Sequence, residues 1–158
     1  MNVPETDISR LILEVERAMQ FAGNFDKQFG EILNEGTKDR TVFQVQLASR
    51  FLELYYNNLE TLFIHIKNIF GNGVEESRWH KSLLELMSRE TSVRPAVITA
   101  KSFHVLDELR GYRHFAKYNF ELELYDWERV SIICAMRKKH HADIIADLKR
   151  FSVFLKQI

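Results

Sequence analysis

The feature that most restricts the fold is a continuous apolar stripe from about Arg40 to Phe70, the strongest periodic signal in the chain. Apolar residues recur there at three- and four-residue steps, the spacing that brings them to one face of an α-helix. They are Val42, Val45, Ala48, Phe51, Leu52, Tyr55, Leu59, Leu62, Phe63, Ile66, Ile69 and Phe70. Leu54 and Tyr56 lie off this stripe, so we expect the helix to bury more than one face, as a central bundle helix or a dimer surface would.

Four other segments show helical periodicity. They are a long helix that starts at Thr6 or Asp7 and ends at Gly36, a short helix with Glu75 and Glu76 at its start, a helix with Pro95 in its first turn, and a helix capped by Asp126 with Glu128 in its first turn. The chain has only two prolines and six glycines, which leaves long segments uninterrupted. We therefore predict an all-α, antiparallel helical bundle of about five helices, with residues 1–158 as a single domain.

Composition argues against several classes of protein. The net charge is zero at pH 7, which does not fit a protein whose whole surface grips nucleic acid but leaves room for a local basic patch. Cys134 is the only cysteine and lies in an apolar run, so we predict a small buried hydrophobe. No apolar run is long enough to span a membrane and no signal peptide is visible, so we expect a cytoplasmic location.

The histidines do not predict a metal site. His65 and His80 each lie near a lysine in the sequence and are expected to be solvated, while His140 and His141 are adjacent and face different directions. The chain contains no phosphate-binding glycine loop, no His-Glu-x-x-His motif and no Cys-x-x-Cys pair. We predict neither a metal nor a cofactor.

The segment most suggestive of chemistry is 107–120, where cationic residues are interleaved with aromatic ones. On a helix Arg113 and Lys117 share one face, and Arg110 and His114 form a second, slightly rotated pair. Such a ridge could offer charge to an RNA phosphate and a stacking ring to a base. The alternative, which the residues alone favour, is a solvated face of a bundle helix whose aromatic residues pack inward.

A second basic run covers residues 137–141. Five consecutive helical residues cover all sides of a helix, so part of this run must point away from the core. It is either a solubilising cluster or a second phosphate contact, for RNA or for a nucleotide on a partner. The sequence leaves both interpretations open.

The segment 110–120 resembles the signature of HEPN-domain proteins, in particular the HepT-like toxins of toxin–antitoxin pairs. That signature is an arginine, four to six residues, a histidine, and commonly a tyrosine two residues later. Arg113-His114 matches its opening. The expected histidine position is occupied by Tyr118, and the expected tyrosine position by Phe120.

The resemblance covers nearly the whole chain, including residues 54–60 and 126–129, and implies an HEPN-like bundle. It also implies a metal-independent endoribonuclease in which Arg113 holds the phosphate and the motif histidine acts on a ribose hydroxyl. Tyr118 is a poor base at neutral pH, because a phenol has a pKa of about 10, so we expect the activity to be weak or lost. His114 points about 100° away from Arg113 around the helix and could replace the histidine only if the backbone turned it toward the same cleft.

The resemblance further implies a homodimer, with both copies of Arg113 beside a shared groove, and a nucleotidyltransferase antitoxin partner. That partner silences the toxin by adding AMP to the motif tyrosine. Phe120 has no hydroxyl group, which leaves Tyr118 as the modification candidate, with Arg110 and Lys117 as candidate RNA- or phosphate-binding residues. Two alternatives stay open: a non-catalytic binding module that keeps the nucleotidyltransferase partner, or an unrelated helical interaction protein.

Overall fold

Helix α2 is the element against which all the others pack. The structure, a computed structural model, describes residues 3–34, 40–71, 79–118 and 126–158. Its helices are α1 (Glu5–Asn34), α2 (Val42–Phe70), α3 (Trp79–Met87), α4 (Ala100–Tyr118) and α5 (Trp127–Leu155). α2 contacts α1, α3, α4 and α5.

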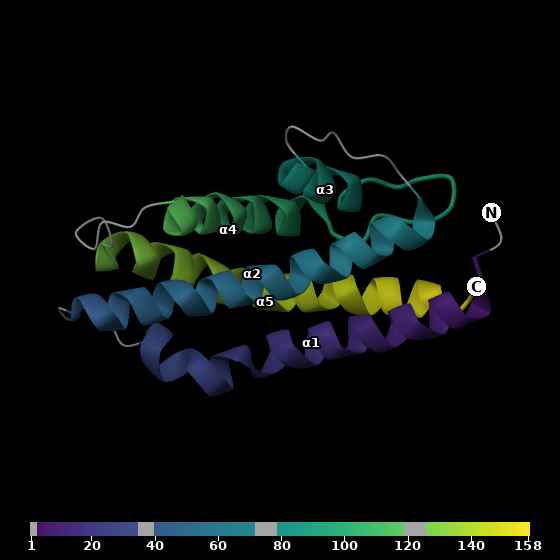
Figure 1. The fold of residues 1–158 in the computed structure, drawn as a ribbon. Helices are drawn as coiled ribbons and strands as arrows, with labels where there is room; N and C mark the ends of the chain where they lie inside the picture. Colours follow the sequence, from purple (N-terminus) through teal and green to yellow (C-terminus); the bar gives the residue numbers. More distant parts are fainter. Residues whose placement is uncertain (1–2, 35–39, 72–78, 119–125) are drawn as a thin grey trace.

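The four long helices lie side by side, and the short α3 lies against α2 and α4 (Figure 1). α1 and α2 run in opposite directions, as do α4 and α5, and α1 packs against α5 as well as against α2. The predicted all-α antiparallel bundle of about five helices is confirmed by these helices.

α2 buries more than one face, as its sequence predicted. Tyr55 and Tyr56 are adjacent, and therefore about 100° apart around the helix, yet they are 0% and 1% exposed. Leu54 is half-buried. The apolar stripe of α2 is thus largely covered within the bundle, which is the position of a central helix.

Both ends of α2 are fixed by local chemistry. The Thr41 hydroxyl accepts a hydrogen bond from the backbone N–H of Gln44 at 3.2 Å, and the Gln44 side chain accepts one from the backbone N–H of Thr41 at 3.0 Å. This reciprocal capping box satisfies two donors at the helix start. Gly71 ends the helix with φ of 60°, in the left-handed region that glycine tolerates.

Two of the predicted helix starts agree with the structure, and two other predicted ends fall outside the described residues. α1 begins at Glu5, next to the predicted Thr6 or Asp7, and Asp126 caps α5 as predicted, accepting a hydrogen bond from the backbone N–H of Glu128 at 2.9 Å. The predicted stop at Gly36 and the predicted acidic start at residues 75–76 lie outside the described residues.

The predicted start of the fourth helix is wrong, because α4 begins at Ala100 and Pro95 precedes it. The buried Arg94 guanidinium donates hydrogen bonds to the backbone carbonyls of Leu86 at 2.9 Å and Pro95 at 2.9 Å, which fixes a turn between α3 and α4. Thr99 N–H then donates to the Asp147 carboxylate at 2.8 Å. Tertiary contacts, not the proline, therefore decide where this helix starts.

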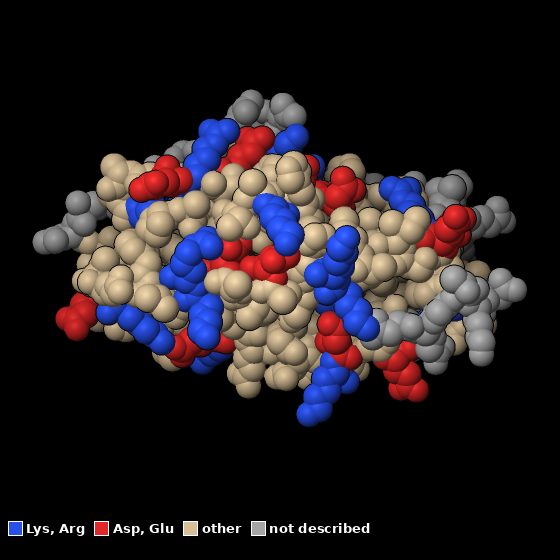
Figure 2. Space-filling model, turned by 180° about the vertical axis from the view of Figure 1, so that it is seen from behind, with Lys and Arg blue, Asp and Glu red and all other residues tan. Residues whose placement is uncertain are grey.

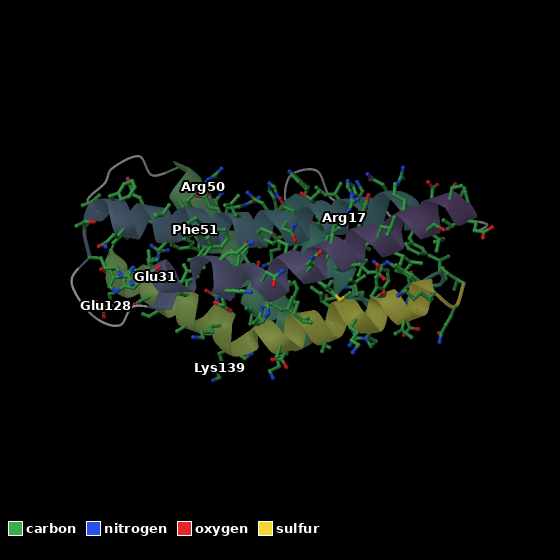
Figure 3. All side chains as sticks on the ribbon, turned by 90° about the horizontal axis from the view of Figure 1, so that it is seen from below. Arg17, Glu31, Arg50, Phe51, Glu128 and Lys139 are labelled. Atoms are coloured by element: carbon green, nitrogen blue, oxygen red, sulfur yellow. The ribbon has the colours of Figure 1, made fainter. Side chains whose placement is uncertain are left out.

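The basic run of α5 divides between the core and the surface. Lys138 and Lys139 are exposed, and Lys139 points away from the bundle (Figure 3). Arg137 is 0% exposed and forms an ion pair with Asp26 of α1. Part of the run was predicted to point away from the core, and the two lysines do so, whereas Arg137 faces α1 and the core and cannot belong to a surface cluster.

On the face shown in Figure 2, the side chains of Lys and Arg alternate with those of Asp and Glu. Cys134 is buried, as predicted, and burial raises the pKa of its thiol to about 12. Among the described residues, no helix combines the length and the apolar character needed to cross a membrane.

Candidate functional site

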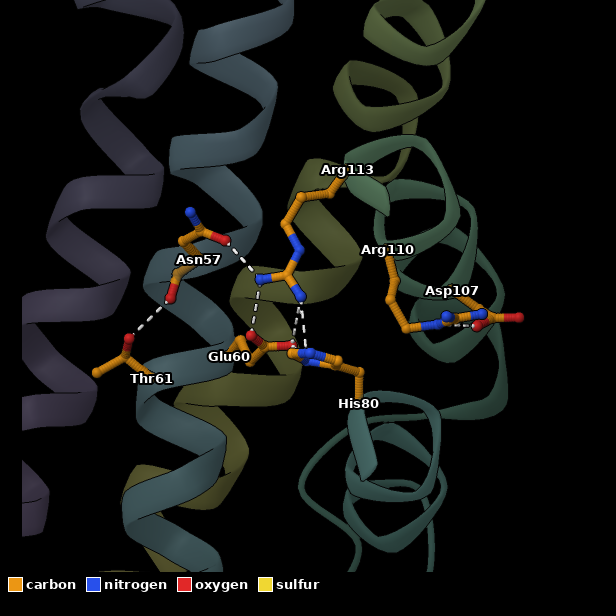
Figure 4. Close-up of polar contacts among 7 residues, drawn as sticks. All are labelled: Asn57, Glu60, Thr61, His80, Asp107, Arg110 and Arg113. Carbon is orange, nitrogen blue, oxygen red and sulfur yellow. Dashed lines mark hydrogen bonds and ion pairs between the residues drawn. The ribbon is translucent and has the colours of Figure 1, made fainter. Parts of the chain in front are cut away.

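Arg113 of α4 turns toward α2 and away from solvent. Its Nη1 donates hydrogen bonds to Asn57 Oδ1 at 2.8 Å and to Glu60 Oε1 at 2.8 Å, and its Nη2 donates to Glu60 Oε2 at 3.4 Å (Figure 4). The side chain of Arg113 is only 17% exposed and that of Glu60 only 8%. This fork-shaped pairing uses the planar geometry of the guanidinium, and it fixes Arg113 in one orientation.

The spacing on α2 explains how this partner surface forms. Asn57 and Glu60 are three residues apart and therefore lie on the same face of the helix. Tyr56 lies next to them, and the guanidinium carbon of Arg113 is 4.9 Å from the centre of its ring, a cation–π distance. Burial raises the pKa of Tyr56 well above its usual value, and the negative charge of Glu60 raises it further, so Tyr56 keeps its proton.

His80, from the second position of α3, completes the cluster. Its Nδ1 lies 2.7 Å from Glu60 Oε2 and 3.0 Å from Arg113 Nη2. Nδ1 cannot donate to the carboxylate and accept from Arg113 at once, and donation to Glu60 satisfies an oxygen that is buried. Arg113 and His80 therefore both donate to the carboxylate of Glu60. We call Tyr56, Asn57, Glu60, His80 and Arg113 the Arg113 cluster.

His80 was predicted to be solvated, and it is partly solvated but also paired with Glu60. Its side chain is 37% exposed, and its ring centre lies 3.7 Å from that of Trp79, with the two planes 32° apart. The Trp79 ring, itself 39% exposed, covers one side of the imidazole. Because the carboxylate and the ring both restrain it, His80 is a positioned group at the edge of the cluster.

The other predicted site residues lie differently. Arg110 is bound to Asp107 of its own helix, with Nε 2.7 Å from Oδ1, and His114 is exposed. None of the contacts described for Arg113 involves either of them. The side chains of Lys117 and Tyr118 lie outside the described part of the chain, so the predicted Arg113–Lys117 pairing stays a prediction. Arg113 itself is covered and paired, and so is not part of an open cationic ridge.

Asn57, Glu60 and His80 were not identified as site residues from the sequence. A signal for two of them was present, because the run 54–60 that carries part of the family resemblance contains Asn57 and Glu60. No comparable signal marks His80, which lies 33 residues from Arg113 in the sequence. The contact depends on how α3 docks, which local patterns do not specify.

A second carboxylate–histidine pair lies elsewhere on α2. His65 Nδ1 is 2.7 Å from Glu14 Oε2 of α1, and the His65 side chain is 44% exposed. Both residues line a surface groove of about 390 Å³ between α1 and α2. His65 is thus partly solvated, as predicted, although it is paired. Among the described residues, no group of His, Cys, Asp or Glu side chains is placed to hold a metal ion.

Comparison with known proteins places this cluster in a family context. A protein-family model described as HepT-like protein matches residues 47–155. The match spans more than half of the chain and contains every residue of the Arg113 cluster. No curated protein and no solved structure was found to match the chain.

Proposed function

The chain belongs to the HepT-like protein family, and on this premise we propose that it is a component of a toxin–antitoxin pair. We propose further that it contacts RNA at the Arg113 cluster and cleaves it slowly, without a metal ion. The observation that carries the proposal is the placement of a restrained arginine beside a half-exposed imidazole, at 3.0 Å. Guanidinium groups bind phosphate oxygens, and imidazole moves protons near neutral pH.

The charge of the cluster supports slow rather than efficient cleavage. Arg113 is paired with Glu60 in the free chain, so an RNA phosphate must compete with a buried carboxylate for the guanidinium. With four residues between it and Arg113, Tyr118 occupies the position where HepT-like toxins carry histidine. Loss of one well-placed proton-transfer group typically costs about 10² to 10⁴ in rate.

Single-stranded RNA cleavage in the presence of EDTA tests the proposal. We expect the natural chain to cleave slowly, and the Tyr118→His variant to gain about 10² or more in rate by restoring the arginine, four residues, histidine spacing. We expect Arg113→Ala to abolish cleavage both in the natural chain and in the Tyr118→His variant, because the guanidinium that binds the phosphate is removed. Arg50→Ala, which removes an exposed arginine paired only with Glu53 among the described residues, is the matched control and leaves both rates unchanged.

Two results would contradict this assignment. Cleavage that persists after Arg113→Ala in a folded protein would place RNA elsewhere on the surface. A Tyr118→His variant that loses stability and gains no activity would show that position 118 serves packing and not chemistry.

A second candidate function is a binding module that keeps the nucleotidyltransferase partner without catalysis. The observation that favours it is the neutralisation of Arg113 by Glu60 together with the loss of the motif histidine and tyrosine at 118 and 120. We propose that a nucleotidyltransferase encoded beside this chain binds it without modifying Phe120, which has no hydroxyl acceptor. Any modification falls on Tyr118 and is slow.

Intact-mass measurement after incubation with that nucleotidyltransferase and ATP tests the partner proposal. The expected spectrum shows the unmodified mass, or slow addition of one AMP that Tyr118→Phe prevents. Rapid adenylylation of a residue outside 110–120 would contradict the mapping of the motif onto this chain.

A further inference from the structure

We infer that His80, held by Glu60, is the group that takes the proton from the attacking ribose hydroxyl in this chain. The inference rests on the proposed RNA cleavage and names the residue that supplies the chemistry where the motif histidine is missing. It is carried by the geometry of α3, which brings an imidazole from outside the family motif to the motif arginine.

The contact with Glu60 selects the form of the imidazole that can act as a base. A neutral imidazole carries one N–H, and the 2.7 Å contact to Glu60 Oε2 places that N–H on Nδ1. The lone pair is then on Nε2. Among the described residues, no hydrogen bond to Nε2 of His80 is found. A carboxylate that fixes the tautomer and orientation of a histidine is a recurring arrangement in proton-transfer sites.

Access and orientation agree with this role. The side chain of His80 is 37% exposed, so a substrate hydroxyl can reach it, whereas the side chains of Arg113 and Glu60 are only 17% and 8% exposed. The Trp79 ring packs on the imidazole and is itself 39% exposed. A nucleobase can stack on an exposed aromatic ring of this kind, which would bring the ribose of that nucleotide close to His80.

Arg113 and His80 are close enough to act on one phosphodiester. Arg113 Nη2 lies 3.0 Å from His80 Nδ1, so a phosphate held at the guanidinium would bring the neighbouring 2′-hydroxyl within reach of the imidazole. Glu60 contacts both groups and acts as a positioning residue. The pairing of Arg113 with Glu60 also holds the guanidinium beside the imidazole of His80.

The proposed step is an internal transesterification. Nε2 of His80 takes the proton of the 2′-hydroxyl, the 2′-oxygen forms a bond to the adjacent phosphorus, and the bond from phosphorus to the 5′-oxygen breaks. The leaving 5′-oxygen takes a proton from water, and the imidazolium returns its proton to the resulting hydroxide. The products are a 2′,3′-cyclic phosphate and a 5′-hydroxyl, and no oxidant, reductant or other reactant is consumed.

The test compares two histidines that have matched carboxylate contacts. His80→Gln and His65→Gln each remove an imidazole that lies 2.7 Å from a glutamate oxygen, and thermal melting establishes that both variants are folded. The substrate is a DNA oligonucleotide with a single ribose, at enzyme excess. We expect His80→Gln to lower the cleavage rate of the natural chain by about 10² or more and His65→Gln to leave it unchanged.

Chemical rescue separates catalysis from support of the fold. We expect His80→Ala to recover cleavage when free imidazole is added, in proportion to its concentration, because a small base can enter the vacated space. The all-DNA oligonucleotide must stay intact, since it lacks the 2′-hydroxyl. A His80→Ala protein that is folded but not rescued would overturn the inference.

Failure of this inference and failure of the proposed function give different results. If Tyr118→His cleaves RNA and the natural chain does not, or if His80→Gln cleaves as fast as the natural chain, RNA cleavage belongs to this fold but His80 is not its base. If no variant cleaves any RNA, both fail. His80→Gln is also made in the Tyr118→His variant. If it slows cleavage by the natural chain but not by Tyr118→His, the imidazoles at positions 80 and 118 act independently, and the inference stands.

Discussion

At the level of single side chains, two ion pairs shape this molecule, and they are buried to different extents. Arg137 is fully buried while its partner Asp26 is 30% exposed. In the Arg113 cluster the carboxylate of Glu60 is the deeper partner. A buried charge is tolerated because it is paired, and removal of its partner leaves an uncompensated charge in the interior.

This asymmetry predicts the effect of removing Asp26. Asp26→Ala leaves Arg137 buried between Phe25 and Tyr55, whose ring centres lie 4.8 and 5.1 Å from the guanidinium carbon. We expect the free energy of unfolding to fall by about 3 kcal/mol, measured by urea denaturation.

The control for this measurement is Glu16→Ala. Glu16 pairs with Lys156, and both side chains are about half exposed. Exposed pairs contribute at most about 1 kcal/mol. Equal effects of Asp26→Ala and Glu16→Ala would show that Arg137 does not depend on its partner. Replacement of both members, Asp26→Ala with Arg137→Met, should restore part of the loss, because no buried charge remains.

Of the residues in the Arg113 cluster, only one could be predicted from the sequence. Arg113 could be named, because the arginine that opens a family motif is visible in the sequence. Its partner Glu60 lies 53 residues away, and His80 belongs to a helix whose docking no local pattern specifies. The site forms only when α2, α3 and α4 pack together, so the sequence could predict Arg113 but not the residues that contact it.

At the level of elements, periodicity located the helices, and capping chemistry set their ends. α2 was predicted from about Arg40 and begins at Val42, after the capping residue Thr41. The start of α4 was misplaced because Pro95 is compatible with a first helical turn, while the bonds of Arg94 and Asp147 hold residues 94–99 in a turn. Local sequence signals misplace a helix start where side chains such as Arg94 and Asp147 hydrogen-bond to the backbone groups that the helix would otherwise use.

The cap of α2 yields a prediction of its own. Thr41→Ala removes the hydroxyl that accepts from Gln44 N–H, and we expect a loss of about 1 kcal/mol in the free energy of unfolding. Thr61→Ala is the matched control, since Thr61 is an exposed residue inside the same helix whose hydroxyl donates to the Asn57 carbonyl. Alanine has a high helix propensity, so Thr61→Ala should cost nothing. A silent Thr41→Ala would mean that the start of α2 is held by packing alone.

At the level of the whole molecule, the bundle covers most of the apolar stripe of α2, so only the start of that stripe is left for the dimer surface considered from the sequence. Few large apolar side chains of the described residues are exposed, and two of them begin α2: Val42 is 48% exposed and Phe43 71%. We still propose a homodimer, as HEPN-like proteins usually form, and place these two residues in or near its interface.

Light scattering coupled to size exclusion tests the assembly. We expect about twice the chain mass of 18.7 kDa at micromolar concentration. Phe43→Glu should shift the protein toward the monomer, because it puts a charge into an apolar contact. Arg50→Glu, an exposed substitution farther along the same helix, serves as the control. A strict monomer before any substitution would rule out the dimer.

The packing of α1 against α5 also sets the order of events while the chain is being made. α1 is synthesised first and α5 last, yet Arg137 reaches Asp26 across 111 residues of sequence. Contacts so distant cannot form before the later partner exists. Every residue of the Arg113 cluster is translated before α5 begins. A nascent chain that already contains the whole cluster therefore still exposes the side of α1 that α5 will cover, and a chaperone or binding partner acting at that stage would meet an unfinished bundle.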